Sequence, residues 1–361
     1  MTPHSEKKFA TLRRWNRSKN YFMKSLRMRF AKMIWDHRSK KAFALQDIRK
    51  ILLLRDDDKI GDMVVSTSVM RELSKQGYLV DILATPKNAA IVQYNPYVNK
   101  VLSTEAPGIA AQLSAEKYDL VIDMGDKISP ASLRFLRNLS AKNVIGFNKE
   151  NYNIYNKSVQ YHDFNGHITN RYDLLMQVMG LADYSTQYEL FYPAELDQDV
   201  LSFLQKMGHE KFVLINAFAA DSRREMSFSQ LEELIHSLKN LYPNTGIILL
   251  DHLNKIDFTL PEDVYISPFN TLLSAIALIS HIDMIISPDT SIVHIAATYN
   301  KPLVALYGND LHGKYVNSDV WGPGYANAIQ LRTVNKYHEV SSIPVSEIIA
   351  AIHKLSSGEL K

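Results

Sequence analysis

Residues 287–297 read Ser-Pro-Asp-Thr-Ser-Ile-Val-His-Ile-Ala-Ala and hold several side chains that can bind an anion. The apolar run before them is typical of a buried strand, and a helical pattern starts at the hydroxyl residues Thr290 and Ser291. Such a residue caps some N–H groups of the helix, while the remaining N–H groups and the helix dipole attract negative charge. The segment therefore predicts a phosphate site, with Asp289 and His294 available for polar contacts. A capped helix without a ligand is the alternative.

A second strand-to-helix turn in the first half of the chain also carries charged residues. The apolar run 51–54 leads through Arg55 to Gly61 and Asp62, and a pattern of apolar residues four apart follows. Glycine allows a tight bend or the close approach of a ligand, and aspartate is a residue type that serves as a general base. An N-cap carboxylate is the simpler interpretation of Asp62. Both turns would lie at the carboxyl ends of strands, where open α/β sheets bind ligands.

These turns require strands and helices that alternate, and the chain shows this alternation on both sides of an irregular stretch. We expect strands at 51–55, 79–85, 100–103, 120–124, 144–147, 212–216, 246–250, 284–287 and 303–307. Helices are expected at 172–179, 230–241, 272–279, 291–299 and 345–355. The predicted fold is α/β, with two doubly wound Rossmann-like domains facing a central cleft. The predicted division is a helical arm at 1–48, a first domain at 49–182, a linker at 183–196, a second domain at 197–340 and a C-terminal helix at 341–361 that could cross back to the first domain.

Composition excludes several classes of protein. The 361 residues include no Cys, which excludes disulfides, thiolate nucleophiles and Cys-bound metals and fits a cytoplasmic protein. No apolar run reaches the roughly 18 residues of a spanning helix. The basic N-terminus has no uninterrupted apolar run behind it, so it is a poor signal peptide. No Gly-x-Gly-x-x-Gly or P-loop motif occurs, which argues against dinucleotide oxidoreductases and P-loop enzymes.

The first 50 residues differ sharply in charge from the rest of the chain. They hold 15 Lys and Arg against 3 Asp and Glu, a net charge of +12, so the remainder carries −9. Phe22, Leu26, Phe30 and Ile34 repeat every four residues and form one apolar stripe on a helix. A basic amphipathic helix with aromatic residues suits an anionic membrane surface, which is the favoured interpretation. Packing against the protein body and nucleic-acid binding are the alternatives, and we expect no nucleic-acid partner.

Three segments resemble glycosyltransferase family 9, the bacterial heptosyltransferases of lipopolysaccharide core assembly. LLLRDDDKIGDMVVSTSVMREL, at 52–73, resembles the first strand-to-helix turn of the family. ISPDTSIVHIAATYNKPLVALYG, at 286–308, resembles its donor-site motif, and NPYVNKVL, at 95–102, resembles a third family segment. The similarity covers most of residues 49–335. It implies the glycosyltransferase B fold, with the acceptor bound by the first domain and the nucleotide sugar by the second.

The resemblance also implies a mechanism, which is inverting sugar transfer by single displacement. Asp62 would be the catalytic base, in a turn that includes Arg55 and Gly61. Thr290 and Ser291 would stabilise the departing nucleoside diphosphate, while His294 contacts the diphosphate or the sugar and Asp289 holds sugar hydroxyls or orients the loop. No cofactor is expected, and the acidic run at 56–58 is expected to be solvated rather than to bind a metal. The donor would be ADP-heptose, and the acceptor would be a lipid-linked oligosaccharide at the cytoplasmic face of the inner membrane.

The second domain departs from the family pattern at three places on the donor side. Arg224 stands where the family has the Lys of Lys-x-Trp-Pro and could pair with phosphate, although a solvated loop pair with Arg223 is the alternative. Asn216 begins an Asn-Ala-Phe-Ala segment in place of Asn-Pro-Gly-Ala, and Asp251 is the candidate for an acidic ribose contact. These changes leave two other hypotheses open. One is transfer of another sugar, such as a UDP-linked N-acetylhexosamine, and the other is a non-catalytic relative that acts as an adaptor.

Overall fold

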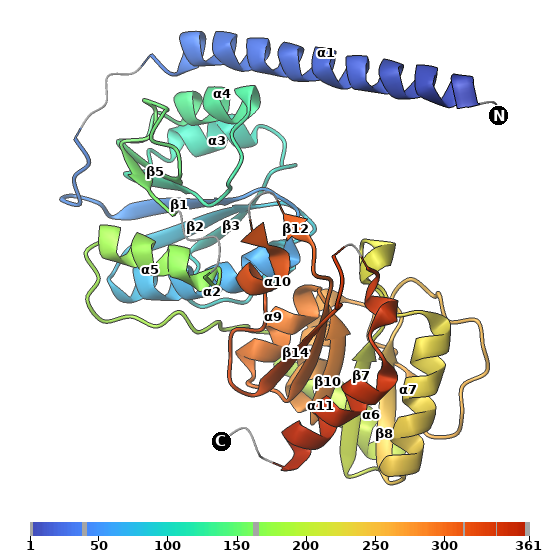
Figure 1. Cartoon of the computed structure of the whole chain (residues 1–361). Coiled ribbons are helices and arrows are strands. Elements are labelled where there is room, and N and C mark those ends of the chain that lie inside the picture. The colour runs from blue at the N-terminus through green and yellow to red at the C-terminus, as the bar shows by residue number, and fades with distance from the viewer. Residues whose placement is uncertain (1–2, 38–41, 162–165, 313–314, 337, 358–361) are drawn as a thin grey trace.

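The protein is one long helix followed by two α/β domains (Figure 1). The computed structural model describes residues 3–37, 42–161, 166–312, 315–336 and 338–357. Each domain is built on a parallel sheet with helices on both of its faces, as alternating strand and helix patterns predict. The prediction of two doubly wound Rossmann-like domains behind a helical arm is confirmed.

The N-terminal domain contains a six-stranded parallel sheet in the order β3-β2-β1-β4-β5-β6. Its strands are β1 (Lys50–Arg55), β2 (Leu79–Ala84), β3 (Lys100–Ser103), β4 (Leu120–Asp123), β5 (Asn143–Phe147) and β6 (Lys157–Val159). Its helices are α2 (Ile60–Lys75), η1 (Ala89–Ile91), α3 (Ile109–Ala115), α4 (Pro130–Leu139) and α5 (Thr169–Val178). Successive residues of β1 point to opposite faces, so Leu53 joins the apolar core under α2 and α5 while Leu52 joins the core under α3 and α4.

The C-terminal domain repeats this plan, with the sheet order β14-β11-β10-β7-β8-β9. Its strands are β7 (Lys211–Asn216), β8 (Thr245–Leu250), β9 (Val264–Ile266), β10 (Met284–Pro288), β11 (Leu303–Tyr307) and β14 (Ala328–Arg332). Its helices are α6 (Ala194–Met207), η2 (Ser222–Arg224), α7 (Phe228–Leu241), α8 (Leu272–His281), α9 (Ser291–Thr298), η3 (Val340–Ser342) and α11 (Val345–Ser357). Between β11 and β14 the chain adds β12 (Leu311–His312), β13 (Tyr315–Val316) and α10 (Asn317–Val320).

Strand order places both predicted turns beside the switch point of their own sheet. In each sheet the first three strands of the chain follow one another toward one edge, and the remaining three follow one another toward the opposite edge. The direction changes between β1 and β4 in the first sheet and between β7 and β10 in the second. Ligands of doubly wound sheets bind outside the carboxyl ends of the strands at this point. The turns after β1 and β10 therefore both lie where such a fold binds its ligands.

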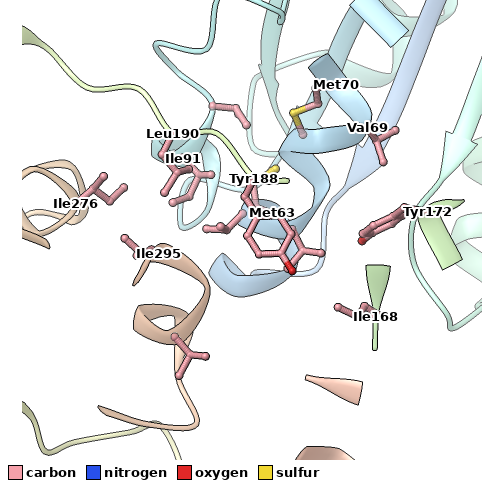
Figure 2. Close-up of a cluster of buried hydrophobic side chains, with 14 of the residues drawn as sticks. Met63, Val69, Met70, Ile91, Ile168, Tyr172, Tyr188, Leu190, Ile276 and Ile295 are labelled. Carbon is pink, nitrogen blue, oxygen red and sulfur yellow. The ribbon is translucent and has the colours of Figure 1, made fainter. Parts of the chain in front are cut away.

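The two domains share one apolar core across their junction (Figure 2). Met63 and Ile91 come from the N-terminal domain, Ile276 and Ile295 from the C-terminal domain, and Tyr188 from the connecting segment, and all five are buried in the same cluster. Burial of such apolar area stabilises the contact by about 25 cal/mol for each Å² removed from water. The relative position of the two domains is thus held by packing as well as by the covalent link.

Helix α1 (Pro3–Trp35) packs on the N-terminal domain through its C-terminal end (Figure 1). Ala31 is buried, and Met28 and Trp35 pack against the core beneath α4. The carboxylate of Asp36, just past the helix, accepts a hydrogen bond from the backbone N–H of Ile154 at 2.7 Å. Among the described residues, no helix combines the length and the apolar character needed to cross a bilayer.

The C-terminal helix and the segment expected as linker differ from the expected layout. Helix α11 does not cross back to the first domain, because its buried residues Ile348 and Ile352 belong to the core that α7 forms with the second sheet. Helix α6 begins at Ala194, inside the segment expected as linker, and packs against α8. The short edge strands β6, β9 and β14 contain no unbroken run of four apolar residues, which is why the sequence pattern did not indicate them.

Candidate active site

Arg55, the last residue of β1, places a buried guanidinium at the start of the first turn. Its Nε donates to Ser66 Oγ at 2.8 Å, and its Nη2 donates to the hydroxyl of Tyr172 at 2.7 Å. Its Nη1 lies 3.1 Å from Asp57 Oδ2 and 3.3 Å from Asp62 Oδ1. Burial alone would lower the pKa of Arg55, but Tyr172 and the two carboxylates raise it overall. The turn therefore contains a permanent positive charge that fixes the carboxylates around it.

Asp62, the third residue of α2, has a carboxylate held between two cations. Oδ1 faces Arg55, and Oδ2 lies 3.7 Å from Nζ of Lys59, which is half exposed. Burial raises the pKa of Asp62 above the ordinary range, and Arg55 and Lys59 oppose part of that rise. A raised carboxyl pKa makes the carboxylate a stronger base. The position thus suits proton abstraction from a bound hydroxyl.

Gly61 brings this turn into direct contact with the helix that follows β10. A Cβ placed at Gly61 would lie 3.1 Å from His294 Cδ2 and 3.8 Å from Ser291 Cα. A larger residue would therefore push against the imidazole of His294 and hold the two turns apart. The structure brings the segments at 55–62 and 289–294 together, although more than two hundred residues separate them in the sequence.

Thr290 is the N-cap of α9, as the sequence pattern indicates. Its Oγ1 accepts a hydrogen bond from the backbone N–H of Ile292 at 3.3 Å. The same Oγ1 accepts from Nδ2 of Asn216, at the end of β7, at 3.1 Å, and it lies 3.1 Å from Ser287 Oγ. Asn216 Nδ2 also donates to Ser287 Oγ at 3.0 Å. A network of neutral groups thus fixes the helix start where Ser291, its first residue, faces the N-terminal domain.

Asp289 connects three segments of the C-terminal domain. Its Oδ2 accepts from Arg224 Nη1 at 3.1 Å and from Asn317 Nδ2 at 2.8 Å. Burial raises the pKa of Asp289, and Arg224 and Asn317 partly offset this. The side chain of Arg224 is 37% exposed, so its guanidinium also reaches solvent. Arg224 is therefore an ion-pair partner of Asp289 rather than one half of a solvated pair with Arg223, which instead pairs with Asp221 at 2.9 Å.

His294 lies in the domain junction, between aromatic rings. Its imidazole packs edge-on against Tyr188 at 6.2 Å and Trp321 at 5.9 Å between ring centroids. Burial, with a smaller contribution from His167, lowers the pKa of His294 to about 3. The ring is therefore neutral at physiological pH, and it can donate a single N–H. Any contact with a diphosphate would use this neutral form.

Asp251 follows β8, and its two carboxylate oxygens bind its own loop. Oδ1 accepts from the backbone N–H of Lys255 at 2.8 Å, and Oδ2 accepts from that of Ile256 at 2.9 Å. These bonds account for the position of Asp251 without a ligand. The ribose contact stays a prediction.

A third turn, after β4, contacts two buried cations that sequence reasoning missed. The buried guanidinium of Arg171 pairs with Asp126 Oδ1 at 2.9 Å and donates to the carbonyl oxygen of Met124 at 2.9 Å. The amine of Lys149, also buried, donates to the carbonyl oxygen of Gly125 at 3.1 Å. These two cations lie beside the switch point of the first sheet. The acids of this turn are thus paired with two buried cations from other segments of the N-terminal domain.

Part of this third turn had a signal in the sequence. The segment Asp-Met-Gly-Asp at 123–126 repeats the arrangement of acids and a glycine after an apolar strand. No sequence signal pointed to Arg171 or Lys149, because neither residue lies next to that strand in the chain. Asn317 and Trp321 also lack a recognisable motif, and they reach the site only through the fold.

Asp57, the central residue of the acidic run at 56–58, has partners within the protein. Asp57 pairs with Arg55 and accepts from the backbone N–H of Lys59 at 3.4 Å. Within the part of the chain that the structure describes, no three His, Cys, Asp or Glu side chains are grouped so that they could hold a metal ion.

Fold and site together define a class of protein. Two doubly wound domains face each other, with a buried acid at the strand end of one and a capped helix N-terminus at the strand end of the other. This is the architecture of a glycosyltransferase with the B fold, and solved structures of this class match it. A structure from Veillonella parvula, described as a glycosyl transferase of family 9, aligns with a TM-score of 0.72 and 17% identity over 87% of this chain and 99% of that one. ADP-heptose lps heptosyltransferase II of Escherichia coli aligns with a TM-score of 0.69 and 18% identity over 86% of this chain and 100% of that one.

The family model described as glycosyltransferase family 9 (heptosyltransferase) matches residues 108–341, and the chain belongs to this family. It is therefore a glycosyltransferase. The putative lipopolysaccharide heptosyltransferase 4 of Escherichia coli K12 is 25% identical over 359 residues, which cover 95% of this chain and 97% of that one. Lipopolysaccharide heptosyltransferase 3 of the same strain is 25% identical, over 82% of this chain and 95% of that one.

Proposed function

We propose that this glycosyltransferase moves a heptose-like sugar from ADP-heptose to a lipopolysaccharide or lipooligosaccharide core acceptor, with inversion at the anomeric carbon. Two relatives that match most of the chain are named as lipopolysaccharide heptosyltransferases, and one similar solved structure is that of an ADP-heptose heptosyltransferase. The N-terminal domain would bind the acceptor and the C-terminal domain the nucleotide sugar.

The reaction is a single displacement in which Asp62 acts as the base. Its carboxylate takes the proton from an acceptor hydroxyl as that oxygen attacks the anomeric carbon. The bond from the anomeric carbon to the β-phosphate oxygen breaks, and its electron pair leaves with ADP. The pKa of Asp62, raised by burial, favours proton transfer of this kind, which contributes about 10²–10⁴-fold in rate. Arg55 keeps the carboxylate aimed without taking part in the bond changes.

The donor side stabilises the negative charge that develops on the leaving diphosphate. The N-terminus of α9, capped by Thr290 and beginning at Ser291, supplies backbone N–H groups and the positive end of the helix dipole. The half-exposed guanidinium of Arg224 lies at the same end and can pair with phosphate oxygens. Neutral His294 would donate one N–H to the diphosphate or the sugar.

One observation carries this proposal, namely the contact between Gly61 and the first residue of α9. It sets the base-bearing turn of one domain against the anion-binding helix end of the other. Single displacement needs the acceptor oxygen and the leaving phosphate on opposite sides of one carbon atom. Two facing turns, each carrying one of these functions, meet that requirement.

Two experiments test the proposal. Calorimetric titration with ADP, UDP and GDP should find ADP bound most tightly, with that binding weakened in Thr290→Pro, because proline removes a residue that caps α9. Incubation with ADP-heptose and a truncated lipopolysaccharide core should then add one heptose to the core, as read by mass spectrometry. Preferential UDP binding and transfer of N-acetylhexosamine would replace the heptose proposal with that of another family 9 activity. Absence of binding by all three nucleotides would refute donor binding as described.

We also propose that α1 binds the anionic cytoplasmic face of the inner membrane, where a lipid-linked acceptor would be found. The packing alternative accounts for only one face of the helix, through Met28 and Ala31. The opposite face leaves Phe22 and Met33 each 66% exposed and Phe30 53% exposed. Apolar and aromatic side chains of this kind, on a helix rich in Lys and Arg, are typical of interfacial helices. Each cation near an anionic surface contributes about 1 kcal/mol.

Vesicle binding tests this role of α1. The whole chain should sediment with phosphatidylglycerol vesicles and not with neutral phosphatidylcholine vesicles. The double variant Phe22→Ser, Phe30→Ser should lose most of that binding, because it removes the exposed aromatic residues. Leu201→Ser, which changes an apolar residue that is exposed on α6, is the matched control and should bind as the wild type does. Equal binding by all three proteins would contradict the proposal.

A further inference from the structure

The segment between β11 and β14 reaches across the junction to the N-terminal domain (Figure 1). The backbone N–H of Ile168, just before α5, donates to the carbonyl oxygen of Val320 at 2.8 Å. The Nε2 of His167 lies 3.0 Å from the carbonyl oxygen of Gly322, and because that oxygen can only accept, Nε2 is the donor. A Cβ at Gly324 would lie 2.6 Å from the same nitrogen, so this approach requires glycine. Two hydrogen bonds thus join residues 320–322 to the other domain.

The same segment contacts the donor side of the site. Asn317, the first residue of α10, donates from Nδ2 to Asp289 Oδ2 at 2.8 Å. Asp289 shares that oxygen with Arg224, the cation that would face a diphosphate. A phosphate that draws Arg224 away would leave this carboxylate oxygen to Asn317. The position of Asn317 should therefore respond to nucleotide binding.

One helical turn further on, the segment contacts the acceptor side. Trp321 donates its backbone N–H to the carbonyl oxygen of Asn317 at 2.9 Å, so the two residues move together. The indole of Trp321 lies 6.0 Å from Nζ of Lys59 and packs edge-on against His294. Lys59 in turn lies 3.7 Å from Asp62 Oδ2. A cation is attracted to the face of an indole ring, so the ring holds the amine near the base.

We propose that Asn317 and Trp321 are positioning residues that couple nucleotide binding beside Asp289 to the placement of Lys59 beside Asp62. The inference rests on the proposed function, because it takes the nucleotide to bind next to Arg224. Binding of the diphosphate shifts the contacts of Asp289, Asn317 follows, and Trp321 carries Lys59 with it. The catalytic base thereby acquires its final charge environment only when the donor is present.

The fluorescence of Trp321 also provides a way to measure this coupling. The chain has three tryptophans, and Trp15 and Trp35 both lie in α1. The double variant Trp15→Phe, Trp35→Phe therefore leaves Trp321 as the single tryptophan in the whole chain. Addition of ADP to this protein should change its emission, and the change should saturate at the dissociation constant that calorimetry gives for ADP.

Further substitutions in that background separate coupling from simple structural damage. Asn317→Ala should remove most of the emission change while ADP affinity falls by no more than about tenfold, the effect of one lost hydrogen bond. His167→Ala should reduce the change, and His167→Gln should restore it, because the amide can donate to the same carbonyl. Tyr325→Phe removes a 2.6 Å bond to the carbonyl oxygen of Lys301 inside the same domain, and it should leave the change intact.

The outcomes distinguish the inference from the proposed function. ADP binding with no change in Trp321 emission, or a full change in Asn317→Ala, would overturn the coupling and leave the transferase proposal standing. An equal loss of the emission change in Tyr325→Phe and Asn317→Ala would also overturn the coupling, because any disturbance of the segment would then be enough to remove the change. Failure of the parent double variant and the wild type to bind ADP, UDP or GDP would overturn both proposals.

Discussion

The turns after β1 and β10 lie against each other, but they hold their charged groups in different ways. In the N-terminal turn the guanidinium of Arg55 is 1% exposed and contacts two hydroxyls and two carboxylates. In the C-terminal turn the network around Thr290 is neutral, and the nearby cation, Arg224, is 37% exposed. One side of the site is fixed by a buried cation, whereas the other keeps its cation within reach of solvent.

The difference fits the role proposed for each side of the site. A buried guanidinium loses its hydration and is tolerated only where partners replace that hydration, so its position cannot vary much. A base gains from such rigidity, because its geometry is set before the substrate arrives. A group that binds and releases a charged nucleotide in every cycle needs the opposite property. The neutral capping network positions the helix end, and the accessible Arg224 is the cation proposed to bind the phosphate.

The largest effect expected is on transfer in Asp62→Asn. The amide keeps the shape of the carboxylate but cannot accept a proton, so the transfer rate should fall by about 10²–10⁴-fold. ADP binding, measured by calorimetry, should stay close to that of the wild type because the proposed nucleotide site lies on the other domain. Asp289→Asn is the matched variant and should weaken ADP binding more than Asp62→Asn does. Near-normal transfer by Asp62→Asn would exclude it as the base.

Replacement of Arg55 tests whether the N-terminal turn depends on buried charge. Arg55→Met leaves Asp62, Tyr172 and Ser66 without their shared donor, and removal of one member of a buried ion pair typically costs about 3–5 kcal/mol. Urea unfolding should show a loss of about that size. Arg223→Met, at an arginine that is 52% exposed, should change stability by less than about 0.5 kcal/mol. Equal losses in both variants would remove the contrast between buried and exposed cations.

The junction itself should be sensitive to acid through His294. Its pKa in the folded protein is about 3, below the ordinary 6.5, so the unfolded chain binds a proton that the native state does not. Stability is then fully present above pH 6.5 and is lost as the pH falls toward 3, by about 2 kcal/mol at pH 5. His294→Phe should flatten this part of the curve of unfolding free energy against pH. His236→Gln, at an exposed histidine, should leave the curve unchanged, and a curve that stays as steep in His294→Phe would contradict the assignment.

The smallest effect is expected at the helix cap. Thr290→Val preserves the shape of the side chain and removes the oxygen that accepts from Ile292 and Asn216, so unfolding free energy should fall by about 1 kcal/mol. Ser291→Ala, one residue later, does not alter the N-cap and should change it by less than about 0.5 kcal/mol. Thermal unfolding measures both. Stability of Thr290→Val equal to that of Ser291→Ala would show that the capping network does not fix the helix start.

Much of the fold could be predicted from the sequence because central strands carry unbroken apolar runs. The runs that end at Arg55 and at Ser287 gave strands within one residue of the observed β1 and β10. The edge strand β14 is half-buried along most of its length and showed no such run. The sequence did not predict which domain the C-terminal helix packs against. An amphipathic helix such as α11 fits any apolar surface, and only the core that it joins decides its position.

The sequence by itself determined the chemical groups at each strand end, namely an aspartate and an arginine at one and an aspartate, a threonine and a histidine at the other. These follow from local order along the chain, since a strand, a turn and a helix start are neighbours in sequence. The tertiary structure alone decided which distant groups surround them. The contacts of Arg171 with Asp126, of Asn317 with Asp289 and of Trp321 with His294 depend on strand order and on the packing of the two domains. Such contacts join residues far apart in the chain, so no spacing pattern records them.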